Sequence, residues 1–104
     1  MHVALLYVDG CPNWQQTLAD VTTVLKEYQV STEVELIKVT SNEEAERLAF
    51  LGSPTILVDG ADIDPDALDS EYSLEQRAYW VEDTPQERPP REWIAAAIDA
   101  ALEK

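Results

Sequence analysis

The chain has little of several things, and each shortage excludes a class of protein. A single cysteine among its 104 residues, Cys11, excludes an internal disulfide and a cysteine-rich zinc site. No apolar run is long enough to cross a membrane, and no basic region precedes an apolar one near the start. We therefore expect one domain over residues 1–104, in a reduced cytoplasmic setting and without a signal peptide.

Basic residues are the second shortage. Seven lysines and arginines stand against 21 acids, which makes the formal net charge −14. Such a surface repels phosphate backbones and anionic lipids, so we expect no nucleic-acid partner and no membrane partner. The same charge is typical of a well-solvated surface, or it steers a cationic partner where the acids gather in one patch.

The most informative stretch runs from the first strand into the first helix. An almost uniformly apolar run over 3–8 is followed by a turn, Cys11 and Pro12, and then by helical spacing up to Tyr28. The helix is predicted over 12–28, with one apolar face made of Trp14, Leu18, Val21, Leu25 and Tyr28. Proline favours the first helical position, which would make Cys11 the N-cap. Its sulfur would then face free N–H groups and the positive end of the helix dipole, a setting that favours the reactive thiolate.

The middle of the chain continues the alternation of strands and helices. A second strand is predicted over 34–39, with Val34, Leu36 and Val39 facing inward. Ser41 and Glu44 have the spacing of a capping box that opens a short helix, and Gly52 is expected just past its end. A third strand is predicted over 55–58. This order, βαβαβ, predicts parallel strands joined by crossover connections.

The last third is less regular. Residues 61–75 read as an acidic loop, 76–81 as a fourth strand, 85–90 as a linker and 91–102 as a last helix. The loop has the spacing Asp62-x-Asp64-x-Asp66, but an EF-hand needs Gly and Glu where Ala67 and Ser73 stand. We therefore expect no metal site in this loop or elsewhere.

Two short motifs carry a family resemblance. Gly10-Cys11-Pro12-Asn13-Trp14 and Gly52-Ser53-Pro54-Thr55 resemble the active-site loops of the thioredoxin superfamily, in particular small bacterial thioredoxin-like and glutaredoxin-like proteins with one cysteine. The resemblance implies a thioredoxin-like α/β fold, βαβαββα, with a central mixed sheet and helices on both faces. It also implies a cis Ser53–Pro54 bond beside Cys11. The chain departs from the family's C-x-x-C motif, because Trp14 stands at the second cysteine position.

This resemblance assigns the candidate site. Cys11 is the expected catalytic residue, and the expected substrate groove consists of Pro12, Trp14, Ser53, Pro54 and Thr55. The backbone of Ser53 is expected to be exposed and to dock an extended peptide as an added strand. Trp14 either packs on the core or forms a wall of the groove, three residues from Cys11.

Two functions remain open at this point. The first is monothiol thiol–disulfide exchange at Cys11, with no bound cofactor and with glutathione or another external thiol as co-substrate. The second is a non-catalytic module that binds a peptide or protein at the Cys11–Pro54 groove, where the cysteine is incidental. A soft-metal carrier is a weaker third option, because one thiolate is too few for tight binding without a dimer.

Overall fold

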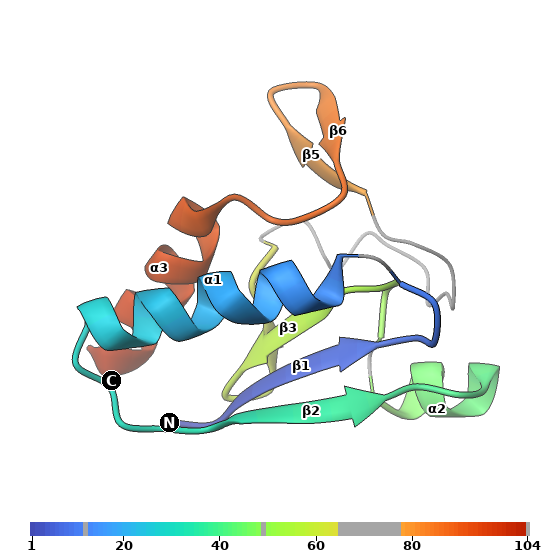
Figure 1. Cartoon of the computed structure of the whole chain (residues 1–104), viewed down its shortest axis with the longest axis horizontal. Helices are drawn as coiled ribbons and strands as arrows, with labels where there is room; N and C mark the ends of the chain where they lie inside the picture. The colour runs from blue at the N-terminus through green and yellow to red at the C-terminus, as the bar shows by residue number, and fades with distance from the viewer. Residues whose placement is uncertain (12, 49, 65–77, 104) are drawn as a thin grey trace.

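A computed structural model describes residues 1–11, 13–48, 50–64 and 78–103 (Figure 1). The chain is a mixed α/β protein. Its elements, in order, are β1 (Val3–Tyr7), α1 (Trp14–Glu27), β2 (Val34–Lys38), α2 (Asn42–Arg47), β3 (Thr55–Val58), β4 (Ala61–Asp62), β5 (Tyr79–Val81), β6 (Thr84–Gln86) and α3 (Arg91–Leu102).

The main sheet has the strand order β2-β1-β3-β4 and is mixed. β2 runs parallel to β1, whereas β3 is antiparallel to β1 and β4 is antiparallel to β3. The predicted parallel direction is therefore wrong for β3. The helix in the connection from β2 to β3, α2, has six residues and is about 9 Å long, so it does not return the chain along the sheet. β3 begins opposite the end of β1, with Thr55 against Leu6, and runs back.

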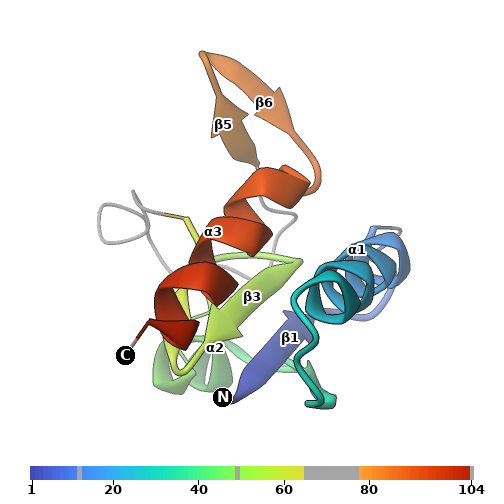
Figure 2. The same cartoon turned by 90° about the vertical axis from the view of Figure 1, so that its left-hand side faces the viewer.

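Side chains of β1 enter two cores, one on each face of the sheet. Val3 and Leu5 pack under α1 and α3, while Ala4 and Leu6 pack on the side of α2. Figures 1 and 2 show α1 and α3 on one side of the sheet and α2 on the other. Helices on both faces of a mixed sheet, which the resemblance implied, are confirmed, and the apolar run of β1 follows from burial on both sides.

Two predicted inward residues lie at the margin of the core. Leu36 is 46% exposed, because β2 is an edge strand and has a neighbouring strand on one side only. Tyr28 is 38% exposed, because it is the C-cap of α1 and lies beyond the part of the helix that covers the sheet. Val34 does pack against the α1–α3 core, as predicted.

The capping box of α2 is confirmed, with one difference. The Ser41 hydroxyl accepts a hydrogen bond from the Glu44 amide at 3.1 Å. The Glu44 carboxylate reaches past Ser41 and accepts from the amide and the hydroxyl of Thr40. These bonds, the one from the hydroxyl first, lower the pKa of Glu44 below its ordinary value of 4.5.

The end of α2 comes earlier than predicted. The helix stops at Arg47 with Leu48 as C-cap, so Gly52 is not at the position after the helix. Instead the Phe50 amide donates to the Ala45 carbonyl at 2.7 Å, and the Phe50 side chain is fully buried in the core beneath α2. Burial of this large ring turns the chain inward and ends the helix.

The predicted fourth strand belongs to a separate hairpin. The strand that continues the main sheet is β4, which follows β3 through a tight turn at Asp59 (φ 51°) and Gly60 (φ 85°). β5 pairs instead with β6, which lies partly in the predicted linker at 85–90. Residues 65–77, which include most of the acidic loop and the first part of the predicted strand, lie outside the described residues.

The last helix, α3, has its predicted bounds. Among the described residues, no helix has the length and apolar character needed to span a bilayer.

Candidate functional site

Antiparallel pairing of β1 and β3 brings the two predicted loops to the same end of the sheet. The Cys11 amide donates to the Val8 carbonyl at 3.3 Å, and the Val8 amide donates to the Ser53 hydroxyl at 3.2 Å. Val8 therefore joins the cysteine turn to the proline loop. The Ser53–Pro54 bond is cis, as the resemblance implied.

The cysteine side chain and the proline loop are buried. Cys11 is 6% exposed, and Ser53 and Thr55 are 0% exposed. The predicted exposed docking edge at Ser53 is therefore wrong. The reason is that the polar groups of the loop have partners inside the protein: Ser53 accepts from Val8, the Thr55 hydroxyl donates to the Gly52 carbonyl, and the Pro54 carbonyl accepts from a tyrosine hydroxyl described below.

Cys11 is not the N-cap of α1. The helix begins at Trp14 with Asn13 as its N-cap, and the Asn13 carbonyl accepts from both the amide and the hydroxyl of Thr17. Cys11 belongs instead to the preceding turn, which Gly10 permits with a φ of 81°. The helix dipole falls off within the first turn, so its effect on the sulfur is smaller than the sequence suggested. Pro12, expected at the first helical position and in the groove, lies outside the described residues.

Trp14 packs on the body of the protein. Its ring stacks on Tyr7, with centroids 4.4 Å apart and planes 18° from parallel, and it contacts the core under α1 and α3. The packing interpretation is therefore confirmed. The predicted one-turn spacing from Cys11 is wrong, because α1 begins at Trp14 and Cys11 therefore precedes the helix.

Two residues that sequence reasoning did not assign also shape the site. Tyr79 of β5 is fully buried, donates its hydroxyl to the Pro54 carbonyl, and meets Trp93 edge to face at 6.2 Å. Asp20 of α1 is 8% exposed and accepts from Arg88 at 3.0 Å and from Arg91 at 3.2 Å. Asp20 shares the buried face of α1 with Thr17, Val21 and Val24. Its helical spacing from these residues was the only signal for it in the sequence.

These contacts hold the base of the β5–β6 hairpin beside the two loops. Tyr79 binds the proline loop, and the side-chain amide of Asn13, at the start of α1, donates to the Glu87 carboxylate at 3.2 Å. Arg88, the next residue along the chain, adds an ion pair with Asp20 of α1. Beyond this base the hairpin projects from the body of the protein in both views (Figures 1 and 2). Trp80, next to the buried Tyr79, is 60% exposed.

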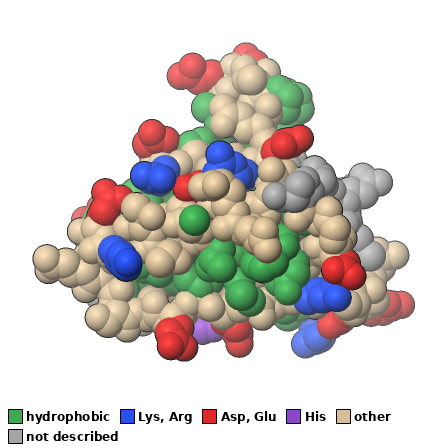
Figure 3. All heavy atoms as spheres, viewed as in Figure 1, with side chains coloured by type: hydrophobic (Ala, Val, Ile, Leu, Met, Phe, Trp, Pro, Cys, Tyr) green, Lys and Arg blue, Asp and Glu red, His purple; other side chains and the backbone are tan. Residues whose placement is uncertain are grey.

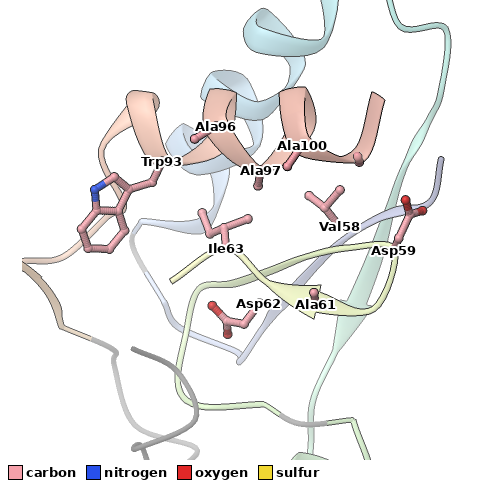
Figure 4. Close-up of a pocket in the computed structure, with 10 residues that line it drawn as sticks. Val58, Asp59, Ala61, Asp62, Ile63, Trp93, Ala96, Ala97 and Ala100 are labelled. Atoms are coloured by element: carbon pink, nitrogen blue, oxygen red, sulfur yellow. The ribbon is translucent and has the colours of Figure 1, made fainter. Parts of the chain in front are cut away.

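A separate hollow lies between α3 and the β3–β4 turn. It has a volume of about 370 Å³, and Val58, Ile63, Trp93 and alanines of α3 make its walls (Figure 4). None of the predicted site residues lines it. Within the described part of the chain, His, Cys, Asp and Glu side chains do not gather in a group of three that could hold a metal ion.

The chain was compared with known families, curated proteins and solved structures. None of the three comparisons yields a match. The function is therefore argued from the geometry of this chain alone.

Proposed function

We propose that the chain is a thioredoxin-like domain and that Cys11 performs thiol–disulfide exchange as a single thiol. The element order β1-α1-β2-α2-β3-β4, closed by α3, supports this fold. One observation carries the functional part: the hydrogen bonds from Cys11 to Val8 and from Val8 to Ser53, which join the cysteine turn to the cis-proline loop.

The exchange needs only one cysteine and an external thiol. The Cys11 thiolate attacks one sulfur of a substrate disulfide, a bond forms between the two sulfurs, and the other substrate sulfur leaves as a thiolate. A second thiolate, such as that of glutathione, then attacks the substrate sulfur of this mixed disulfide. It takes the substrate half into a new disulfide and returns Cys11 as a thiolate. Trp14 occupies the place of a resolving cysteine, so the mixed disulfide persists until the external thiol arrives.

Burial sets a condition on this chemistry. Cys11 is 6% exposed, and thiol–disulfide exchange requires access to the sulfur. The turn that carries Cys11 must therefore open before it reacts. Turns held by few hydrogen bonds open locally at a lower free energy than core strands, and the hydrogen bond from the Cys11 amide to the Val8 carbonyl is long, at 3.3 Å.

The alternative is a binding module in which Cys11 is an inert core residue. The burial of its side chain favours this alternative, because free cysteine often behaves as a small hydrophobe. The burial of Ser53 counts against docking by strand addition at the proline loop. A module of this kind would therefore need a different surface.

Incubation of the native protein with oxidised glutathione tests the exchange. We expect a one-to-one adduct by mass spectrometry that is absent in Cys11→Ser and is removed by reduced glutathione. Because the thiol is buried, the adduct should form more slowly than on the same protein in denaturant.

A native protein that stays unmodified, while the denatured protein reacts, would contradict the redox proposal. The binding-module alternative would then take its place. Circular dichroism of Cys11→Ser provides the control that the substitution leaves the fold intact.

A further inference from the structure

The outer face of the β5–β6 hairpin presents an aromatic ring and carboxylates together. Side chains alternate between the two faces of a strand, so Tyr79 points into the protein and Trp80 points out. Pro85 is the direct cross-strand partner of Trp80 and is also exposed. Glu82 and Asp83 form the turn at the tip. We call these four outward residues, Trp80, Glu82, Asp83 and Pro85, the hairpin face.

No basic residue neutralises this face from within its own hairpin. The sequence from Ala78 to Glu87 contains three acids and no lysine or arginine. Two arginines flank this stretch: Arg88 is engaged with Asp20 at 3.0 Å, and Arg77 lies outside the described residues. Figure 3 shows acidic side chains and hydrophobic side chains side by side on the projecting part of the molecule.

We propose that the hairpin face binds a basic segment of a partner protein, with an arginine or lysine side chain against the Trp80 ring. Tryptophan is the aromatic residue that attracts a cation most strongly, at about 6 Å or less from its ring. Glu82 lies two residues further along, about 7 Å at the rise of a strand, within the reach of a long basic side chain. The net charge of −14 steers such a partner toward the protein and repels an acidic one.

Other occupants fit this face less well. An apolar peptide would bury Glu82 and Asp83 without pairing their charges, which is costly. Strand addition along β6 is blocked at Pro85, which has no N–H to donate. The chemistry of the face therefore points to cationic side chains rather than to an apolar strand.

The base of the hairpin connects this proposal with the proposed function. Tyr79 contacts the Pro54 carbonyl and Glu87 contacts Asn13, so the hairpin that carries this face is attached at its base to the two loops of the Cys11 site. The inference deepens the proposed function in this one respect: it names a basic protein segment as the substrate class. The binding itself does not require the thiol.

The test therefore uses the full chain with Cys11→Ser, which binds without reacting. The probe is a short, dye-labelled Gly/Ser peptide that carries several arginines, and its match carries glutamates in their place. Fluorescence anisotropy should detect binding of the arginine peptide only, and this binding should weaken as salt is added. Equal binding of both peptides, or of neither, would overturn the proposal.

Variants of the hairpin locate the binding. Trp80→Ala should weaken binding of the arginine peptide by about fivefold or more, and Trp80→Phe should weaken it less, because an aromatic face remains. Glu82→Gln with Asp83→Asn should weaken it by about threefold and should reduce its salt dependence. The charge-matched control, Asp99→Asn with Glu103→Gln, removes the same charge near the end of α3 and should change binding by less than about twofold.

A loss in the control pair as large as that in the hairpin pair would overturn the proposal, because the general acidity of the protein would then explain the binding. Tyr28→Ala, which removes another exposed ring, should leave the affinity unchanged. If the glutathione adduct forms but the peptide does not bind, the hairpin inference fails alone. If the peptide binds but no adduct forms, the exchange proposal fails alone.

Discussion

Tyr79 and Trp80 are neighbours in one short strand, yet they have opposite roles. Tyr79 is fully buried and donates its hydroxyl to the cis-proline loop, whereas Trp80 is 60% exposed and faces Pro85 across the hairpin. The same contrast separates the closed Cys11–Pro54 site from the open hairpin face. This end of the molecule thus combines a buried thiol, that of Cys11, with an exposed hairpin face. On the proposals above, a partner would contact the hairpin face before it reaches the thiol.

The largest expected effect comes from truncating the inward ring. Tyr79→Ala should lower the free energy of unfolding by about 3–5 kcal/mol, because it leaves a cavity and removes the donor to the Pro54 carbonyl. Chemical denaturation measures the change. Trp80→Ala is the matched control on the next residue, and an exposed substitution of this kind should stay within about 0.5 kcal/mol. Equal losses in the two variants would break the contrast.

Asp20 should come next, because it holds the segment after the hairpin to α1. Asp20→Asn should cost about 1–3 kcal/mol of unfolding free energy, since it removes a nearly buried carboxylate from two guanidinium groups. Asp99→Asn, an exposed change on α3, serves as the control. In the Asp20→Asn background, Arg88→Gln should add little further loss, because the two residues share one interaction. Additive losses would show that they act independently.

Replacing the hairpin tip should act in the opposite direction. Glu82 and Asp83 have φ of 49° and 68°, and a two-residue hairpin turn with both central residues at positive φ favours Asn-Gly. Glu82→Asn with Asp83→Gly should therefore raise the free energy of unfolding by about 1 kcal/mol. The same pair should weaken binding of the arginine peptide. A variant that is more stable and binds equally well would argue that the tip carboxylates have no part in recognition.

The smallest expected effect concerns α2, on the opposite face of the sheet from the hairpin. The pKa of Glu44 is lowered in the folded state by its bonds to Thr40, so this residue contributes stability above its unfolded value of 4.5. That contribution is lost as the pH falls through the lower, folded value. Denaturation of Glu44→Gln at neutral and acidic pH should give a difference from the wild type that is larger at neutral pH. A constant difference would contradict the linkage.

The sequence predicted the elements whose signals are local. The apolar run of β1 indicates burial on both faces, and the capping box at Ser41 and Glu44 indicates the start of α2. α3 has its predicted bounds, because proline precedes it and apolar residues recur along it. The direction of β3 could not be predicted from neighbouring residues. It depends on α2, which is too short to return the chain to the other end of the sheet.

The candidate site shows the same division. The sequence by itself determined that Cys11 lies in the turn after the first strand and that the Gly-Ser-Pro-Thr segment leads into another strand. Turn residues and β-branched residues indicate both positions to within a few residues. Tertiary structure alone decided that Val8 joins the two loops, that the Tyr79 hydroxyl donates to the Pro54 carbonyl, and that Ser53 is buried. Exposure and long-range hydrogen bonds depend on which distant segments pack together, and no pattern of neighbouring residues specifies that packing.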